Sequence, residues 1–182
     1  MDRGTFASEY QRIYHRLWLI AAAMTGDRSQ ADDLVQEAAV IALSKLDRFT
    51  AGTNFAAWMA EIVRRCSSNH TRKFQTRGTV PTDPTALDQH AGRQASMAVS
   101  SFRPDRVTET SVDHGDFDDP LLHGLNQLSP VARGCLLLRI VRQLTYDEIA
   151  QLMGIPQGTA MSHVHRSKHA LREFLRQQQA LK

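Results

Sequence analysis

The sequence has few cysteines, and their spacing is not that of a metal site. Its two cysteines, Cys66 and Cys135, each lie in apolar, helix-like sequence without a CxxC pair. This pattern predicts reduced core thiols of a cytosolic protein rather than a disulfide framework. The sequence also lacks an HExxH motif and a paired carboxylate and histidine constellation. It therefore does not indicate a metal-dependent enzyme, and we expect no catalytic residue and no cofactor.

Long apolar runs are also absent, since no run approaches the ~18–20 residues that a membrane span needs. The stretch "RLWLIAAAMTG" imitates a signal peptide, with a basic flank, a short apolar core and alanines. However, apolar residues step by three and four through and before it, as in one amphipathic helix: Phe6, Tyr10, Ile13, Tyr14, Leu17, Trp18, Ala21 and Met24. We therefore predict a buried helix face and no membrane partner.

The charge is divided unevenly along the chain. Residues 1–73 carry 10 basic and 8 acidic side chains, residues 74–119 carry 4 and 8, and residues 120–182 carry 8 and 3. A basic C-terminal segment favours an anionic partner, although an ordinary solvated surface is an alternative on charge alone.

Helical periodicity appears in two regions and stops between them. Over residues 1–73, three amphipathic stretches joined by "TGDRS" and "RFTAGTN" predict a compact bundle, with Asp27 or Ser29 and then Asn54 placed as helix caps. Residues 74–119 are rich in Pro, Ser, Thr and Asp without a steady period, which predicts a flexible linker. Such a long loop argues for two domains.

The third region, residues 120–182, carries turn and cap signals close together. Ser129 precedes Pro130, Thr145 and Glu148 match a capping box, and Gly154 follows the next short helix. Two helices joined by a glycine turn form a helix-turn-helix. The predicted fold class is therefore all-α, with a helical bundle, a linker and a helix-turn-helix domain.

The helix after Gly154 has one apolar stripe, formed by Ala160, Val164, Leu171 and Leu175. The other side carries hydrogen-bonding and basic residues: Gln157, Thr159, Ser162, His163, Arg166 and His169. Such donors suit phosphates and the acceptors of guanine in a major groove. Two alternatives are a solvated basic helix and a zinc site at His165 and His169, which lie four residues apart but without a nearby acidic or cysteine ligand.

Here the sequence resembles the bacterial RNA polymerase sigma factors of the extracytoplasmic-function type. The stretch from "LSPVARG" to "ALREFL" is similar to their C-terminal domain, which reads the minus-thirty-five element. The stretch from "DRSQADDLVQE" through "FAAWM" to "NHTRK" is similar to their N-terminal domain, which docks on the polymerase clamp and melts the minus-ten element. Both matches in one chain, in this order, make the resemblance specific.

The resemblance implies roles for three groups of residues. Core polymerase would be bound by Asp33, Leu34, Gln36 and Glu37. The loop Phe49 to Phe55 would hold a flipped base of promoter DNA, and the residues assigned to this loop and to the DNA backbone are Thr50, Thr53, Asn54, Arg64, Arg65, Arg72 and Lys73. The recognition helix would contact DNA through Gln157, Thr159, Ser162, His163, Arg166 and Lys168.

The chain also departs from the family pattern. Arg65 and Asn69 stand where the family usually has Asn and Asp, and "TAMSH" replaces the usual "TVKSR" of the recognition helix. A promoter sequence therefore cannot be inherited from relatives. Members are often held by an anti-sigma protein, and nothing in this sequence specifies one. The alternative function is a helix-turn-helix regulator that binds duplex DNA alone, which leaves "DDLVQE" unexplained.

Overall fold

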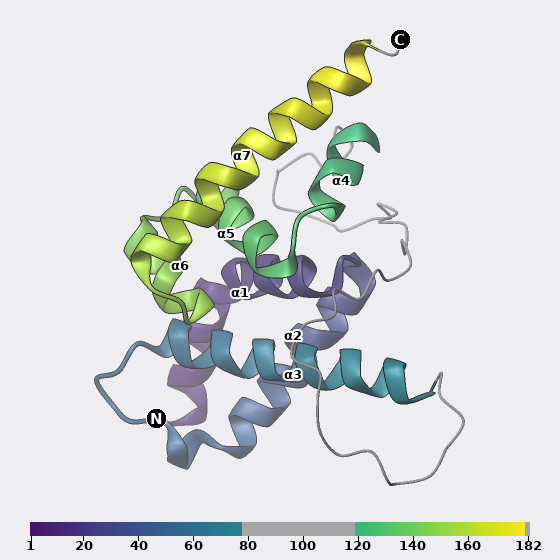
Figure 1. Ribbon diagram of the computed structural model, residues 1–182. Helices are drawn as coiled ribbons and strands as arrows, with labels where there is room; N and C mark the ends of the chain where they lie inside the picture. The colour runs from purple at the N-terminus through teal and green to yellow at the C-terminus, as the bar shows by residue number, and fades with distance from the viewer. Residues whose placement is uncertain (78–118, 181–182) are drawn as a thin grey trace, which may run out of the picture.

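The computed structural model describes the backbone of residues 1–77 and 119–180, and the side chains of residues 1–69 and 120–180. Every regular element in these parts is a helix, which confirms the all-α fold class (Figure 1). The N-terminal module contains α1 (Arg3–Thr25), α2 (Arg28–Ser44), a 3₁₀ turn η1 (Leu46–Arg48) and α3 (Phe55–Arg77). The C-terminal module contains α4 (Asp119–Asn126), α5 (Pro130–Val141), α6 (Tyr146–Met153) and α7 (Gln157–Ala180).

Short polar side chains fix the starts of the helices. Asp27 accepts a hydrogen bond from the backbone N–H of Gln30, and Asn54 accepts one from Ala57 at 3.1 Å. The predicted capping box is present, because the Thr145 hydroxyl and the Glu148 carboxylate each accept from the other residue's backbone N–H. Such caps satisfy the N–H groups that a first helical turn leaves without partners.

The glycine turn between α6 and α7 also has the predicted form. Gly154 has a φ of 64°, in the left-handed region that side chains other than glycine rarely adopt. The chain turns there and α7 begins at Gln157, directly after Pro156. Helices α6 and α7 therefore form the predicted helix-turn-helix.

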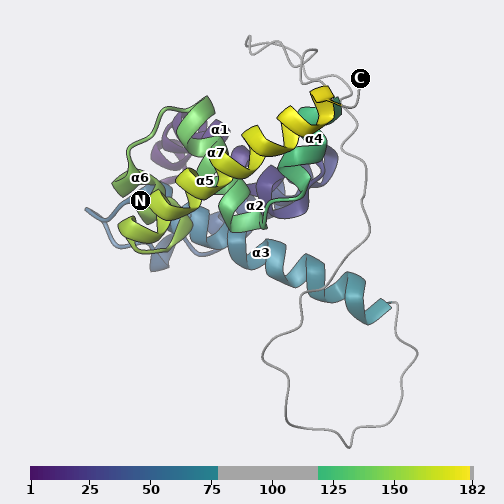
Figure 2. The same cartoon turned by 45° about the horizontal axis from the view of Figure 1, so that its top comes forward.

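The core of the N-terminal module lies between α1, α2 and α3. Its largest fully buried side chains are Leu17, Ile20, Leu34, Val35, Met59 and Val63. In the C-terminal module the corresponding residues are Cys135, Leu136, Leu138, Ile149 and Val164. Helix α4 lies along the second half of α7, where Gly124 meets Leu171 and Phe174 (Figure 2).

The two modules pack directly on each other. Helix α5 lies against α1, and α6 lies against the start of α3, so that one hydrophobic core runs through both modules (Figure 1). Five consecutive residues of α1, from Leu19 to Ala23, are buried. An amphipathic helix with one buried face cannot bury five consecutive residues, so this part of α1 is covered from two sides.

One expectation from the sequence needs correction, and two others agree with the structure. Helix α3 continues to Arg77, so residues 74–77, which were assigned to the linker, are helical. Cys66 and Cys135 are both buried with free thiols, as predicted, and burial raises the pKa of Cys135 to about 11. Across the described ranges, no helix combines the length and the apolar character that crossing a membrane requires.

We expect the packing around Gly134 of α5, which lies next to α6 and α1, to be sensitive to volume. A Cβ atom there would lie 2.9 Å from Met153 Cε and 3.5 Å from Ala23 Cβ. Gly134→Val should therefore lower the free energy of unfolding by ~1–3 kcal/mol, the usual cost of overpacking a core. Urea unfolding followed by circular dichroism measures this loss. Gly158→Val is the control, because no atom lies within 4 Å of its Cβ position. Equal stability of the two variants would contradict the close packing.

Candidate nucleic-acid interface

The first candidate surface is the exposed side of α7. Ser162, Arg166 and His169 are exposed there, as predicted, and Thr159 and His163 lie half-buried at one flank. Gln157 is exposed as the first residue of α7, but it lies on the same side of the helix axis as Lys168. The opposite, apolar stripe includes Ala160 and Val164, which are buried against α5 and α6. The structure thus presents a hydrogen-bonding face of α7 to solvent.

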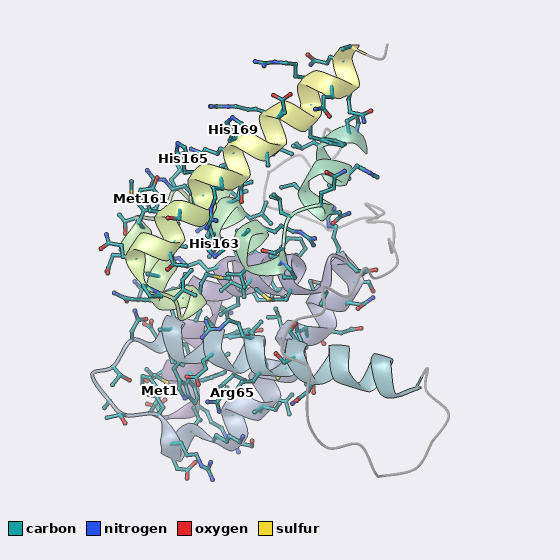
Figure 3. The ribbon with its side chains drawn as sticks, in the orientation of Figure 1. Met1, Arg65, Met161, His163, His165 and His169 are labelled. Atoms are coloured by element: carbon teal, nitrogen blue, oxygen red, sulfur yellow. The ribbon has the colours of Figure 1, made fainter. Side chains whose placement is uncertain are left out.

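Two residues of α7 lie differently from the prediction. Lys168 follows Thr159 by nine residues, which at 100° per residue places it about 180° around the helix. It is half-buried beside the apolar stripe and does not join the reading face. His165 entered the sequence analysis only as a possible metal ligand, but it is exposed near the middle of that face, next to His169 (Figure 3). Met161 is exposed at the edge of the face.

The zinc alternative for His165 and His169 gains no support from their surroundings. Among the described residues, no group of three or more His, Cys, Asp or Glu side chains is placed to hold a metal ion. Two histidines alone do not complete a tetrahedral zinc site.

The second candidate surface is the loop before α3, with an aromatic cluster beneath it. Thr50, Thr53 and Asn54 are exposed, and the Thr53 hydroxyl donates to the Thr50 carbonyl at 2.7 Å. Under the loop, the Phe49 ring lies 5.5 Å from Phe55 and 5.2 Å from Trp58. Phe55 is buried in the core of the N-terminal module.

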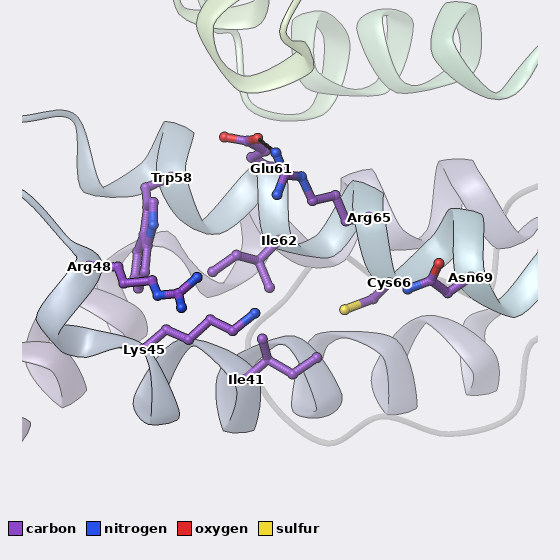
Figure 4. A pocket seen from close by; sticks show the side chains of 9 residues that line it. All are labelled: Ile41, Lys45, Arg48, Trp58, Glu61, Ile62, Arg65, Cys66 and Asn69. Carbon is purple, nitrogen blue, oxygen red and sulfur yellow. Dashed lines mark ion pairs between the residues drawn. The ribbon is translucent and has the colours of Figure 1, made fainter.

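A cavity of about 350 Å³ opens beside this loop, between α2 and α3 (Figure 4). Its lining contains three cationic side chains, one carboxylate, one indole and several apolar groups: Ile41, Lys45, Arg48, Trp58, Glu61, Ile62, Arg65, Cys66 and Asn69. Arg65 pairs with Glu61 at 2.5 Å. A flat ring against Trp58 and an anionic group near Lys45 and Arg48 would both fit this chemistry.

Of the residues that line the cavity, only Arg65 was predicted from the sequence to contact DNA; Lys45, Arg48 and Trp58 were not. The two cations Lys45 and Arg48 come just before the loop in the sequence, and this position could have indicated their role. Arg64 points elsewhere, and its Nη1 donates to the Leu152 carbonyl in α6. Because this contact removes the guanidinium from water, the pKa of Arg64 is lowered. Arg72 and Lys73 lie on α3, but their side chains fall outside the described residues.

The third candidate surface is the outer side of α2. Asp33, Gln36 and Glu37 are exposed there, as expected for a partner-binding face. Leu34 is fully buried in the core, because it belongs to the apolar stripe of α2, and so cannot contact a partner directly. The apolar residues on the outer side are instead Val40, 67% exposed, and Leu43, 40% exposed.

Comparison with known proteins matches this arrangement to one family. The family "Sigma-70 region 2" matches residues 10–77, and "Sigma-70, region 4" matches residues 118–171. The chain belongs to the sigma-70 family, as a sigma factor of the extracytoplasmic-function type. The first match contains the loop, the cavity and the outer face of α2, and the second contains the helix-turn-helix.

Relatives of this sigma factor match over nearly its whole length. The extracytoplasmic-function sigma factor SigW of Bacillus subtilis is 24% identical over 96% of this chain and 91% of its own. CarQ of Myxococcus xanthus, an RNA polymerase sigma factor, is 26% identical over 95% and 90%. Among solved structures, the sigma factor RpoE of Bartonella quintana, in complex with the anti-sigma factor NepR, has a TM-score of 0.63 and 24% identity. It covers 94% of this chain and 97% of that chain.

We expect His163 and Arg166 of α7 to act differently on DNA. His163→Ala should cost ~1–3 kcal/mol and relax the preference at one base position, because it removes a base contact. Arg166→Ala should weaken binding across sequences and flatten the salt dependence, because it removes a phosphate contact. The measurement is binding to promoters selected from a randomised library, with core polymerase present.

Arg176→Ala is the matched control for both variants. Arg176 is an exposed cation on the same helix, paired with Glu173 at 3.7 Å. It lies ~15 Å further along the axis than Arg166. If His163→Ala and Arg166→Ala leave promoter binding as intact as Arg176→Ala does, α7 does not present this face to DNA.

Proposed function

We propose that this chain binds core RNA polymerase and confers promoter specificity on it through two modules. The N-terminal module, which ends with α3 at Arg77, docks on the polymerase and reads the minus-ten element. The helix-turn-helix module, which begins with α4 at Asp119, reads the minus-thirty-five element, and residues 78–118 connect the two. The observation that carries the proposal is the presence of both sigma-70 regions, in order, in one chain.

Docking on core polymerase falls to the outer side of α2. The carboxylates of Asp33 and Glu37 lie near the exposed Val40, so that this face offers negative charge beside an apolar contact. Such a face suits a partner helix that carries arginine and apolar side chains. Leu34 contributes by holding α2 in the core.

Capture of an unstacked base falls to the loop and its surroundings. Thr50, Thr53 and Asn54 supply hydrogen-bonding groups at the surface, and the cavity beside them combines the Trp58 ring with cations. Stacking on an aromatic ring is worth ~1–3 kcal/mol per base, which offsets part of the cost of unstacking. Strand opening then needs binding energy alone, and we assign no catalytic residue and no cofactor.

A stand-alone regulator is the alternative, and it accounts only for α7. It gives no role to the acidic and apolar outer side of α2 or to the cavity between α2 and α3. As a partner of RNA polymerase, the chain would act in the cytoplasm. An anti-sigma protein is a further candidate partner, since RpoE was solved in complex with one.

Reversing the charge on α2 should weaken binding to core polymerase. The Asp33→Arg and Glu37→Arg double variant replaces two exposed carboxylates and leaves the apolar stripe unchanged. Opposing like charges at an interface typically costs several kcal/mol, so retention on immobilised core enzyme should fall at least tenfold.

The Glu9→Arg and Glu173→Arg double variant is the matched control. It changes the net charge of the chain by the same amount, but the substitutions lie on α1 and α7 rather than on α2. Circular dichroism should show that both double variants are folded. If core polymerase retains the α2 variant and the control variant equally, this face does not bind the polymerase.

The test that separates a sigma factor from a stand-alone regulator is a mobility-shift titration with and without core polymerase. Each module offers few cations to DNA, so the free chain should bind duplex promoter poorly at physiological salt. Core polymerase holds both modules in place and makes the second contact effectively intramolecular, which can raise affinity by ~100-fold. Tight, sequence-specific binding by the free chain, unchanged by core polymerase, would favour the regulator.

A further inference from the structure

Helix α3 presents a ring, a carboxylate and a guanidinium to the cavity between α2 and α3. Trp58, Glu61 and Arg65 all line this cavity, and their spacing of three and four residues places them on successive turns of one helix face. Figure 4 shows the indole across one end of the cavity, with the Glu61 carboxylate and the Arg65 guanidinium side by side on the α3 wall. The proposed function assigns an unstacked base to this cavity but does not name the base.

The Trp58 ring is held in place from inside the module. Its centroid lies 5.2 Å from that of Phe49 and 5.9 Å from that of Phe55, and it packs against the buried core. A ring fixed in this way loses little conformational freedom when a base stacks on it. At a contact distance of ~3.5 Å, a base stacked on the cavity side of Trp58 would come level with Glu61, whose Cα atom is ~4.5 Å further along α3. The edge of the base would therefore meet the pair of Glu61 and Arg65.

The ion pair between Glu61 and Arg65 can open to receive a base. Arg65 Nη2 lies 2.5 Å from Glu61 Oε1, but 77% of the Arg65 side chain and 48% of the Glu61 side chain are exposed. Exposed pairs of this kind contribute little to stability, since water competes for both partners. A base that offers hydrogen bonds to both groups would replace a weak contact with stronger ones.

Guanine matches this pair better than the other bases do. A flipped base is read along its Watson–Crick edge, where guanine has two neighbouring N–H donors and the acceptor O6. The two oxygens of the Glu61 carboxylate can accept from both donors, and Arg65 can donate to O6. Adenine and cytosine offer the carboxylate a single amino group, and thymine offers a single ring N–H. Guanine is therefore the base that uses both oxygens of Glu61.

The opposite wall of the cavity carries positive charge. Lys45 directly follows α2, Arg48 ends η1, and both side chains line the cavity from this side (Figure 4). Such cations suit the phosphates next to a captured nucleotide and do not discriminate between bases. The cavity thus offers base reading on the α3 wall and backbone binding on the wall before the loop.

We propose that Glu61 and Arg65 are specificity-determining residues that select guanine in the opened minus-ten strand, with the base stacked on Trp58. This inference rests on the proposed function and names the base that the cavity takes. A carboxylate repels phosphate, so the place of Glu61 among cations that face DNA is explained by a base that donates to it. Arg65, expected from the sequence to contact DNA, acts here as the donor to O6.

The test is a base preference measured on DNA that is already open. Promoters with a mismatched bubble present the minus-ten strand unpaired, and each position of that strand carries each base in turn. At one position, holoenzyme formed from core polymerase and the wild-type chain should bind guanine ~5- to 150-fold better than adenine, the range for one good bidentate contact. Equal binding of all bases at every position would overturn the proposal.

Glu61→Gln should change this preference from guanine to adenine. The amide keeps the size of the side chain but has one acceptor and one donor group, which match the amino group and a ring nitrogen of adenine. Arg65→Ala should reduce the guanine-to-adenine ratio, because the donor to O6 is lost. Both residues are exposed, so the variants should fold as the wild type does, which circular dichroism checks. A ratio equal to that of the wild type in either variant contradicts the proposal.

Two further variants separate base reading from general effects of charge. Asp47→Asn is the matched control for Glu61→Gln, because Asp47 is an exposed carboxylate of η1 that does not line the cavity. It should leave the preference unchanged. Lys45→Ala should weaken binding to all bases alike, because it removes a phosphate contact. If either control changes the guanine-to-adenine ratio as much as Glu61→Gln does, the α3 wall does not read the base.

Failure of this inference can be told apart from failure of the proposed function. A chain that never binds core polymerase, or never directs it to a promoter, contradicts the proposed function and the inference with it. A holoenzyme that initiates from its promoter without a guanine preference in the opened strand contradicts only the reading of the base by Glu61 and Arg65.

Discussion

The second half of α1 is buried from two sides at once, and the rest of the described structure depends on that burial. Its outer neighbours in the N-terminal module are α2 and α3, and α5 covers the remaining side near Ala22 and Ala23. Small side chains allow this close approach, with Gly134 opposite them. Because α5 is fixed on α1, the position of α6 over α3 follows, and with it the contact of Arg64 with the Leu152 carbonyl. One packing contact therefore links the core to the candidate DNA surface.

The local structure could be predicted from the sequence because its causes are local. Asp27, Asn54 and Thr145 each stand just before a helix and bond to its first turn, and Gly154 supplies a left-handed turn. The packing between modules could not be predicted. Alanines in a helix fit a buried or an exposed side equally well, so the run at Ala21–Ala23 has no periodic signal that names α5 as its neighbour.

The residues of the candidate site, too, could be predicted from the sequence only where their surroundings are local. The exposed donors of α7 followed from its apolar stripe, but Lys168 and His165 needed the true position of that stripe around the helix. Leu34 was assigned to a partner because the whole "DDLVQE" segment was taken together. In the helix, Leu34 faces the core, whereas its neighbours Asp33 and Gln36 face solvent. Arg64 could not be placed from sequence at all, since its partner is a backbone carbonyl 88 residues away.

Polar bonds and a shared apolar core together hold the two modules on each other. Asn54, Arg64 and Arg133 each donate from one module to a neutral oxygen of the other, which belongs to an amide or a backbone carbonyl. Between α1 and α5, buried residues such as Ala22 and Cys135 belong to the core that runs through both modules. Separating the modules would remove these acceptors and expose that apolar surface to water. The packing of α5 on α1 therefore decides where Asn54 and Arg64 lie as much as the local sequence around them does.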